Sequence, residues 1–265
     1  MCDSLGRIAG MTLRYWYLLR ASGIKVIELV YWPAMNMVVW GLLTFWFADN
    51  KPTAIETAGS LLAAVMLWDV LFRGQLGLTF SFLEEVWSRN VANLMMSPLH
   101  PVELAASLML MSLIRLIVGM APVTLLALVL FSFNIYGLGF ALVAFFVNLL
   151  LTSWAVGLVV CGLILRNGSG AQSFAWSVMM LLLPVCCVYY PVSILPPWLQ
   201  PIAWCLAPTY VFEGMRSAFL DGIFRADLML QAFALNVLYL GLALATFLLL
   251  LQSARHKGAL LTMGE

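Results

Sequence analysis

Long apolar stretches separated by short polar ones dominate the pattern of this chain. A helix needs about 20 such residues to cross a bilayer core of about 30 Å, because each helical residue advances about 1.5 Å. The apolar positions run on without the period-two alternation of membrane β-strands. The pattern therefore predicts an all-α integral membrane protein with six transmembrane helices. Their predicted bounds are residues 26–48, 58–80, 103–131, 139–165, 172–192 and 231–253.

Residues 1–25 form a segment of a different kind. Leu5, Trp16 and Leu19 recur on one helical face, while Arg7 and Arg14 lie off that face. Such a pattern is typical of an amphipathic helix that lies in the membrane interface. The apolar run that follows is longer than the core of a cleaved signal peptide, and no small-residue cleavage site comes after it, so we interpret it as a retained span.

The segment 81–102 is the longest loop predicted on the side of the N-terminus. Charged side chains alternate there with an apolar stripe, and Pro98 ends the helix. An exposed amphipathic helix of this kind fits a groove on a partner protein, and a helix lying on the membrane surface is the alternative. The residues assigned to this contact are Glu84, Glu85, Trp87, Arg89 and Leu94.

The segment 193–230 is predicted on the opposite side of the membrane. Prolines break its apolar sequence into pieces that are too short to span. Irregular backbone at membrane depth must be covered by protein or line a cavity, so the segment predicts a re-entrant pair of short helices against the outer ends of the spans. Its characteristic residues are Pro196, Trp198, Pro208, Tyr210, Glu213 and Arg216, of which Glu213 and Arg216 are one helical turn apart.

The composition excludes a soluble fold. Apolar residues make up 64% of the 265 residues and charged residues 9%, where soluble domains carry about 25%, and the mean hydropathy is +1.01. So few charged groups cannot cover the outside of a soluble domain. The net charge of +1 gives no bulk attraction to a polyanion, so we expect membrane lipids and not nucleic acid as surroundings.

The basic residues of the predicted loops favour cytoplasmic termini. With the N-terminus in the cytoplasm, nine Lys and Arg residues lie on the inner side and three on the outer side. Inner loops of membrane proteins carry this excess of positive charge. Six spans also return the chain to the side on which it begins, so we expect both termini in the cytoplasm.

Four ionisable side chains fall inside or at the inner end of predicted spans, where a charge is costly and suggests a function. Asp69 and Arg73 are spaced to form an ion pair within one helix, which is either structural or part of a gate near the cytoplasmic mouth. Arg115 is expected to pair with Asp69 across spans or to extend toward lipid headgroups. Glu28 is expected to pair with Lys25 or with Arg20.

The first span is rich in aromatic and sulfur-containing side chains. Most residues of this kind belong to interfacial belts or helix packing. The alternative is a path for an apolar or amphiphilic substrate, and the residues assigned to it are Trp32, Met35, Trp40 and Phe45.

These residues contain no pattern that indicates catalysis or a metal site. The Gly-rich segment 165–170 lacks the lysine of a phosphate-binding loop, so we expect no ATP hydrolysis by this segment of sequence. The five cysteines form no C-x-x-C pair, and His100 and His256 lie far apart. We therefore expect no catalytic residue, no metal ligand and no bound cofactor here.

Two groups of motifs resemble the membrane subunit of type-2 ABC exporters, and the resemblance extends over residues 7–255. The first group is Tyr-Pro-Val-Ser at 190–193, Ala-Pro-Thr-Tyr at 207–210 and Glu-Gly-Met-Arg at 213–216. The second is the acidic pair at 84–85 followed by Met-Ser-Pro at 96–98.

The resemblance implies two six-span subunits in a bacterial cytoplasmic membrane, as a homodimer or with a paralogue. Two separate ATPase subunits, which bind ATP and Mg, are expected beneath them, in contact with the N-terminal helix and the segment 81–102. Substrates of the family include drugs, lipids and lipid-linked polysaccharides, exported along the first, second and fifth spans. The alternative is a secondary carrier driven by an ion gradient, for which Asp69 is the only candidate ion site and no internal repeat is evident.

Overall fold

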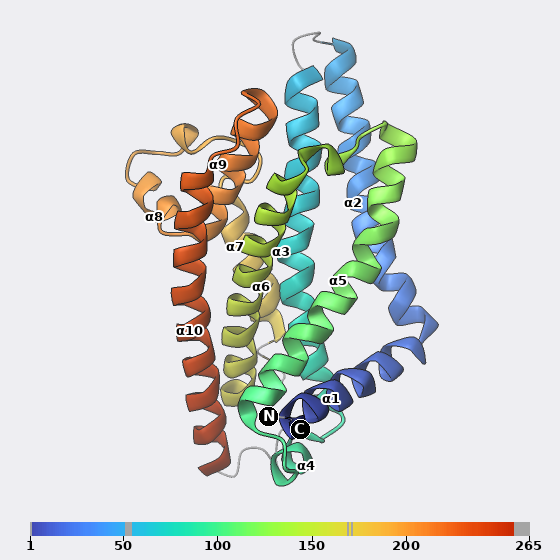
Figure 1. Cartoon of the computed structure of the whole chain (residues 1–265), viewed down its shortest axis with the longest axis vertical. Coiled ribbons are helices and arrows are strands. Elements are labelled where there is room, and N and C mark those ends of the chain that lie inside the picture. The colour runs from blue at the N-terminus through green and yellow to red at the C-terminus, as the bar shows by residue number, and fades with distance from the viewer. Residues whose placement is uncertain (1, 51–54, 169, 171, 257–265) are drawn as a thin grey trace.

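The computed structural model describes residues 2–50, 55–168, 170 and 172–256, and every regular element in those ranges is helical. The long helices stand side by side, with α1 and α4 at one end, called the basal end here, and α8 and α9 toward the opposite, distal end (Figure 1). The elements are α1 (Cys2–Arg20), α2 (Gly23–Asn50), α3 (Ile55–Trp87), α4 (Val91–Met96), α5 (Pro101–Phe131), η2 (Ile135–Leu138), α6 (Phe140–Asn167), α7 (Gln172–Val185), η4 (Val192–Ile194), α8 (Gln200–Trp204), α9 (Ala207–Leu220) and α10 (Ala226–His256).

Five helices in the described residues are long and apolar enough to cross a membrane, namely α2, α3, α5, α6 and α10. They coincide with five of the six predicted spans, although α3 continues seven residues beyond the predicted end at 80 and α10 begins five residues before 231. The fold is therefore that of an all-helical, multi-pass membrane protein.

The fifth predicted span, 172–192, extends too far, because α7 ends at Val185. Its 14 residues cover about 21 Å, short of a bilayer core of about 30 Å. Pro184 has no amide hydrogen to continue the helical ladder, and Cys187 adopts a left-handed conformation with a φ of 54°. The apolar residues that follow α7 therefore form a turn and not a further helical segment.

Helix α3 is the core of the bundle. In the most apolar 18-residue stretch of α3, 89% of the residues are buried, whereas the share in the corresponding stretch is 17% in α2 and 22% in α10. Helices α2, α5 and α6 pack around it, and α9 contacts its distal part. A helix that is apolar on all sides is expected in such a central position.

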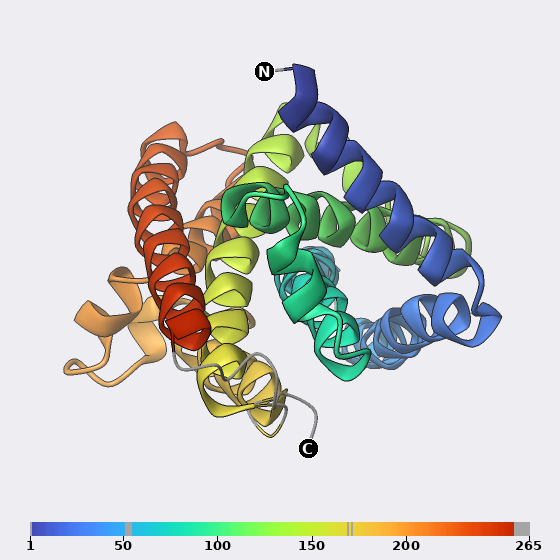
Figure 2. The same ribbon diagram turned by 90° about the horizontal axis from the view of Figure 1, so that it is seen from below.

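Helix α1 lies across the basal end and not along the bundle (Figures 1 and 2). A helix is present in this region as expected, and Leu19 of the predicted apolar face is buried in it. Met11, Tyr15 and Leu19 are buried, whereas Leu5 is 67% exposed. The residues spaced four apart at 11, 15 and 19 form the buried face of α1, which contacts α5 and α2.

Helices α2 and α5 approach each other closely at two glycines, which have no side chain to keep the helices apart. A Cβ at Gly119 of α5 would lie 2.9 Å from the carbonyl oxygen of Leu29 in α2. Farther toward the distal end, a Cβ at Gly41 would overlap the ring of Phe131. Small residues at helix crossings are the usual device for close packing in membranes.

We expect Gly119→Leu to push α2 away from α5, because the new side chain meets a backbone atom that cannot move by itself. Overpacking of this kind costs about 1–3 kcal/mol. The apparent melting temperature in detergent should fall. The matched control is Gly241→Leu in α10, where a Cβ meets nothing within 4 Å. Equal melting temperatures for the two variants would contradict a close α2–α5 contact.

Candidate functional site at the basal end of the bundle

Acidic side chains of α3 and α5 attach α1 and α2 to the bundle at the basal end. The first is Glu103, in the first turn of α5, whose Oε2 accepts from Nε of Arg7 at 2.9 Å and whose Oε1 accepts from Nη2 of Arg7 at 2.6 Å. The Ser4 hydroxyl donates to the same Oε1 at 2.6 Å. Two parallel bonds between guanidinium and carboxylate make a strong, oriented contact, and it joins α1 to α5.

Glu84, in the last turns of α3, connects two further helices. Its Oε1 lies 3.0 Å from Nζ of Lys25 in α2 and 3.1 Å from Nη2 of Arg115 in α5. The prediction that Arg115 pairs with Asp69 or extends to lipid headgroups is therefore wrong, because the crossing of α5 over α3 buries Arg115 beside Glu84. Lys25 likewise pairs with Glu84 and not with the exposed Glu28.

Glu85 is the most buried member of this group, with 1% of its surface exposed. Its Oε1 accepts from Nη1 of Arg14 in α1 at 2.8 Å, and its Oε2 accepts from Nη2 of Arg14 at 3.2 Å and from Nδ2 of Asn90 at 2.6 Å. Burial strongly raises the pKa of Tyr15, and the Glu85 carboxylate raises it further. We call Arg7, Arg14, Lys25, Glu84, Glu85, Glu103 and Arg115 the basal network.

A cavity of about 390 Å³ opens beside the basal network. Its lining combines the charged side chains of Arg14, Lys25 and Glu84 with the ring of Trp87. Within the basal network, Oε2 of Glu84 and Nε of Arg115 are buried without a hydrogen bond. The network is thus incompletely satisfied by its own residues, which is costly in a low-dielectric region.

The positions of Glu84 and Glu85 differ from the predicted docking helix, in which both were expected to be exposed. Helix α3 continues to Trp87, and Glu84 and Glu85 are directed into pairs with α1, α2 and α5 instead of standing free on a surface. Arg89 takes a left-handed conformation, with a φ of 54°, in the turn that leads to α4. Among the large apolar side chains of the predicted region, Trp87 (51%), Met96 (80%) and Val102 (51%) are exposed and Leu94 is half-buried, and the predicted Arg89 is exposed as well. We call Trp87, Leu94 and Met96 the α4 surface.

The predicted pair of Asp69 and Arg73 forms within α3. Nε of Arg73 lies 3.8 Å from Oδ1 of Asp69, and Nδ2 of Asn36 in α2 donates to Oδ2 at 3.4 Å. The guanidinium also lies 5.6 Å from the centre of the Phe72 ring, within the range of a cation–π contact. Asp69 is 2% exposed, so this is a buried ion pair that also connects α3 to α2.

The four residues assigned to a substrate path do not gather in one place. Trp32, Met35 and Phe45 lie on the exposed side of α2. Trp40 faces the bundle, where its ring stacks on Tyr189 after α7 at a centroid distance of 4.7 Å. Three of the four thus form an open apolar face of α2 in the single chain.

At the distal end, Glu213 and Arg216 of α9 hold the turn that follows α7. The predicted contact between them is confirmed, with Nη2 of Arg216 3.1 Å from Oε1 of Glu213. Nη1 of Arg216 donates to the carbonyl oxygens of Cys187 at 2.9 Å and Val188 at 3.3 Å, and the Val192 amide donates to Oε1 of Glu213 at 2.7 Å. The pair therefore ties α9 to residues 187–192.

The other residues of the distal motif differ in their surroundings. Pro208 is buried in the first turn of α9, and the Tyr210 ring meets Trp204 of α8 edge-on at 4.9 Å. Pro196 accepts from the amide of Leu199 at 2.9 Å, while Trp198 is 70% exposed. The short helices expected in this region are present, and α9 packs on α3, α6 and α10.

A polar cluster between α6 and α10 was not predicted. Nδ2 of Asn236 donates to the Asn148 carbonyl at 2.9 Å and to Oδ1 of Asn148 at 3.1 Å, and the Thr152 hydroxyl donates to Oδ1 of Asn236 at 2.6 Å. Hydrogen bonds between spans stabilise helix pairs in a membrane. The signal was available in the sequence, because Asn148 and Asn236 are isolated amides within apolar stretches.

No group of three or more potential metal ligands occurs among the described residues. The chain matches the family model of the ABC-2 type transporter over residues 21–220. A comparison with curated proteins found no match. The matched range runs from the start of α2 to the end of α9 and includes the α3–α5 side of the basal network and the motif around Arg216. On this evidence the chain belongs to the ABC-2 type transporter family.

Proposed function

We propose that this chain is the permease subunit of an ATP-driven exporter whose ATPase subunits are separate polypeptides that bind ATP and Mg. The observation that carries the proposal is the basal network next to the α4 surface. Pairs from α3 and α5 hold α1 and α2, so a displacement of the α3–α4 corner moves four helices together. An ATPase docked there has a mechanical connection to the spans.

In this proposal the basal end and both termini face the cytoplasm of a bacterial cell. Two copies of the chain, or one copy and a paralogue, enclose the substrate path. The open face of α2, with Trp32, Met35 and Phe45, lines it from one side. Aromatic and sulfur-containing side chains suit an amphiphilic substrate such as a drug, a lipid or a lipid-linked polysaccharide.

Isolation of the tagged chain from its native cell in mild detergent tests the proposal. Mass spectrometry of the purified material should find an ABC-type ATPase in a fixed ratio to the chain. Repeated isolation without an ATPase would contradict it and favour a carrier driven by an ion gradient. Asp69 would then be the first residue to replace, because it is a buried carboxylate within a span.

The docking site is tested by truncating the α4 surface. We expect Trp87→Ala combined with Met96→Ser to weaken association with the ATPase by about 30-fold, because loss of a buried tryptophan anchor costs about 2 kcal/mol or more. The control is Trp198→Ala in the distal motif, which removes an exposed tryptophan from the opposite end of the bundle. Unchanged association in the double variant, measured by quantitative co-purification, would place the docking site elsewhere.

A further inference from the structure

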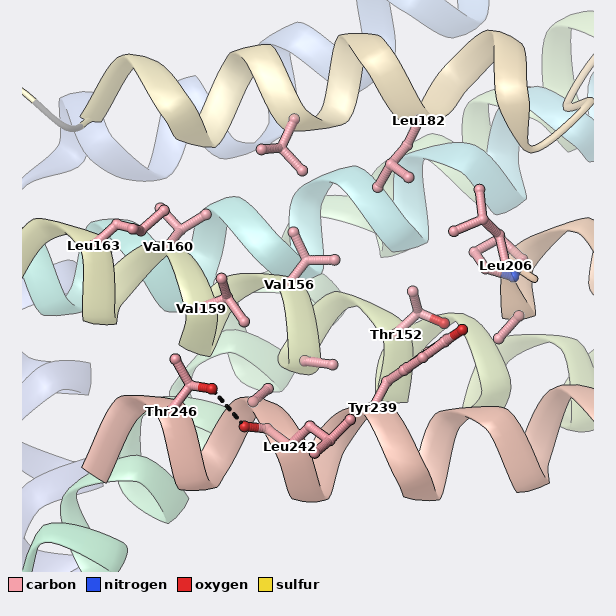
Figure 3. Close-up of a pocket in the computed structure, with 15 residues that line it drawn as sticks. Thr152, Val156, Val159, Val160, Leu163, Leu182, Leu206, Tyr239, Leu242 and Thr246 are labelled. Carbon is pink, nitrogen blue, oxygen red and sulfur yellow. Dashed lines mark hydrogen bonds between the residues drawn. The ribbon is translucent and has the colours of Figure 1, made fainter. Parts of the chain in front are cut away.

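A second cavity, of about 310 Å³, lies away from the basal network and from the open face of α2. Figure 3 shows its walls, with Val156, Val159 and Leu163 of α6 along the middle and Leu182 of α7 and Leu242 of α10 on opposite sides. Leu206, before α9, lies at one end. The consecutive helices α6 and α7 and the more distant α10 thus form one elongated space.

The cavity exists because α7 and α10 both pack on α6 but scarcely touch each other. It extends over α6 from Thr152 to Leu163, which is about 16 Å of helix. On α10 it extends from Tyr239 to Thr246, in the middle of that span. The space therefore opens at the depth where a bilayer is hydrocarbon.

The walls have no free hydroxyl hydrogen to donate to water. The three lining hydroxyls already donate within the protein, from Thr152 to Asn236 at 2.6 Å, from Tyr239 to the Cys205 carbonyl at 2.6 Å and from Thr246 to the Leu242 carbonyl at 2.8 Å. A buried water needs two to four polar partners, and a cavity without them stays dry or takes an apolar ligand.

The shape selects among apolar ligands. A cavity of about 150 Å³ holds one benzene molecule, so a space of about 310 Å³ has room for a larger ligand. Spread over about 16 Å, that volume averages about 20 Å² in cross-section. This is far too narrow for a helix, whose diameter with side chains is about 10–12 Å. A single flexible hydrocarbon chain, lying parallel to the helices, matches the length, width and polarity.

We propose that the acyl chain of a bilayer phospholipid occupies this cavity and fills the gap between α7 and α10. The mouth has partly open residues such as Val159, which is 37% exposed, while the floor has Val160 and Ala243 at 1% and 2%. An acyl chain that enters from the bilayer passes Val159 and reaches Val160 and Ala243. The site depends on the span arrangement alone and not on the transport activity proposed above.

The test uses the full chain, with any subunits that co-purify, in nanodiscs of phosphatidylethanolamine and phosphatidylglycerol. A small fraction of the lipid carries a photoreactive diazirine at the end of one acyl chain. After illumination, peptide mass spectrometry should find the label on Val160 or Ala243, which ordinary surface lipid cannot reach. Label confined to the exposed lipid-facing residues would overturn the proposal.

Matched variants connect the label to the cavity. Val159→Trp closes the mouth and should abolish labelling of Val160 and Ala243. Val147→Trp is the control, since Val147 is on the same helix, is 39% exposed and does not line the cavity. If Val159→Trp does not give a monodisperse protein, Leu242→Trp closes the same mouth from α10. Floor labelling that survives a folded mouth variant would overturn the proposal.

Discussion

Glu84→Gln is expected to lower the apparent melting temperature of the purified protein more than any other single change in the basal network. The substitution keeps the shape of the side chain and removes its charge. Arg115 is 6% exposed and then has no acid beside it. Removing one partner of a buried ion pair costs about 3–5 kcal/mol, because the remaining charge stays out of water.

Lys25→Gln is the matched control, because it removes the other cation that pairs with Glu84. Its side chain is 43% exposed, and exposed pairs contribute about 0–1 kcal/mol. The melting temperature should therefore change little. A fall as large as that of Glu84→Gln would show that the burial of Arg115 is not what makes the site sensitive.

A second variant separates the uncompensated charge from a loss of packing. Arg115→Met in the Glu84→Gln background removes the stranded charge and leaves an unbranched, shorter apolar side chain in its place. If charge burial is the cause, the double variant melts at a higher temperature than Glu84→Gln alone. A double variant that is less stable than either single variant would contradict this cause.

The features that the sequence predicted well depend on local order. Five spans follow from continuous apolar runs, and the pairs Asp69–Arg73 and Glu213–Arg216 follow from spacing along one helix. Each span and each of these ion pairs is determined by residues within a single helix. Helical geometry alone brings such residues together.

The features that it missed depend on how helices cross. Arg115 and Glu84 are 31 residues apart, and Arg7 and Glu103 are 96 apart. Nothing in the spacing shows which faces will meet. The burial of Glu84 and Glu85 could not be predicted either. Charged residues at the end of an apolar run indicate a solvent-exposed loop, and only the position of α1 shows that this end is covered. The end of α7 was missed because apolar residues continue beyond Pro184 into a turn.

The second large effect is expected at the distal end, where Arg216→Met should loosen the turn after α7. The substitution keeps an unbranched apolar stem and removes the donor to the Cys187 and Val188 carbonyls and the ion-pair partner of Glu213. Arg216 is 12% exposed, so the partners that remain are poorly hydrated. Each buried polar group left without a partner costs about 1–3 kcal/mol.

Cysteine chemistry reports on this turn directly. Cys187 is fully buried in the wild type and its carbonyl is held by Arg216, so a thiol reagent should label it slowly. The experiment uses a background with Cys2→Ser and Cys205→Ser, which removes the exposed Cys205 and the cysteine near the N-terminus. Arg216→Met should speed the labelling of Cys187 several-fold, because the turn opens more often.

Arg225→Met provides the comparison for Arg216→Met, because Arg225 is also paired at the distal end but is 48% exposed and bonded to an equally exposed Asp227. Water replaces that partner, so neither stability nor labelling should change. Arg216→Lys should give an intermediate rate, since an ammonium lacks the planar fork that reaches two carbonyls and a carboxylate together. Equal labelling rates in Arg216→Met and Arg225→Met would mean that packing around α9, and not Arg216, holds the turn.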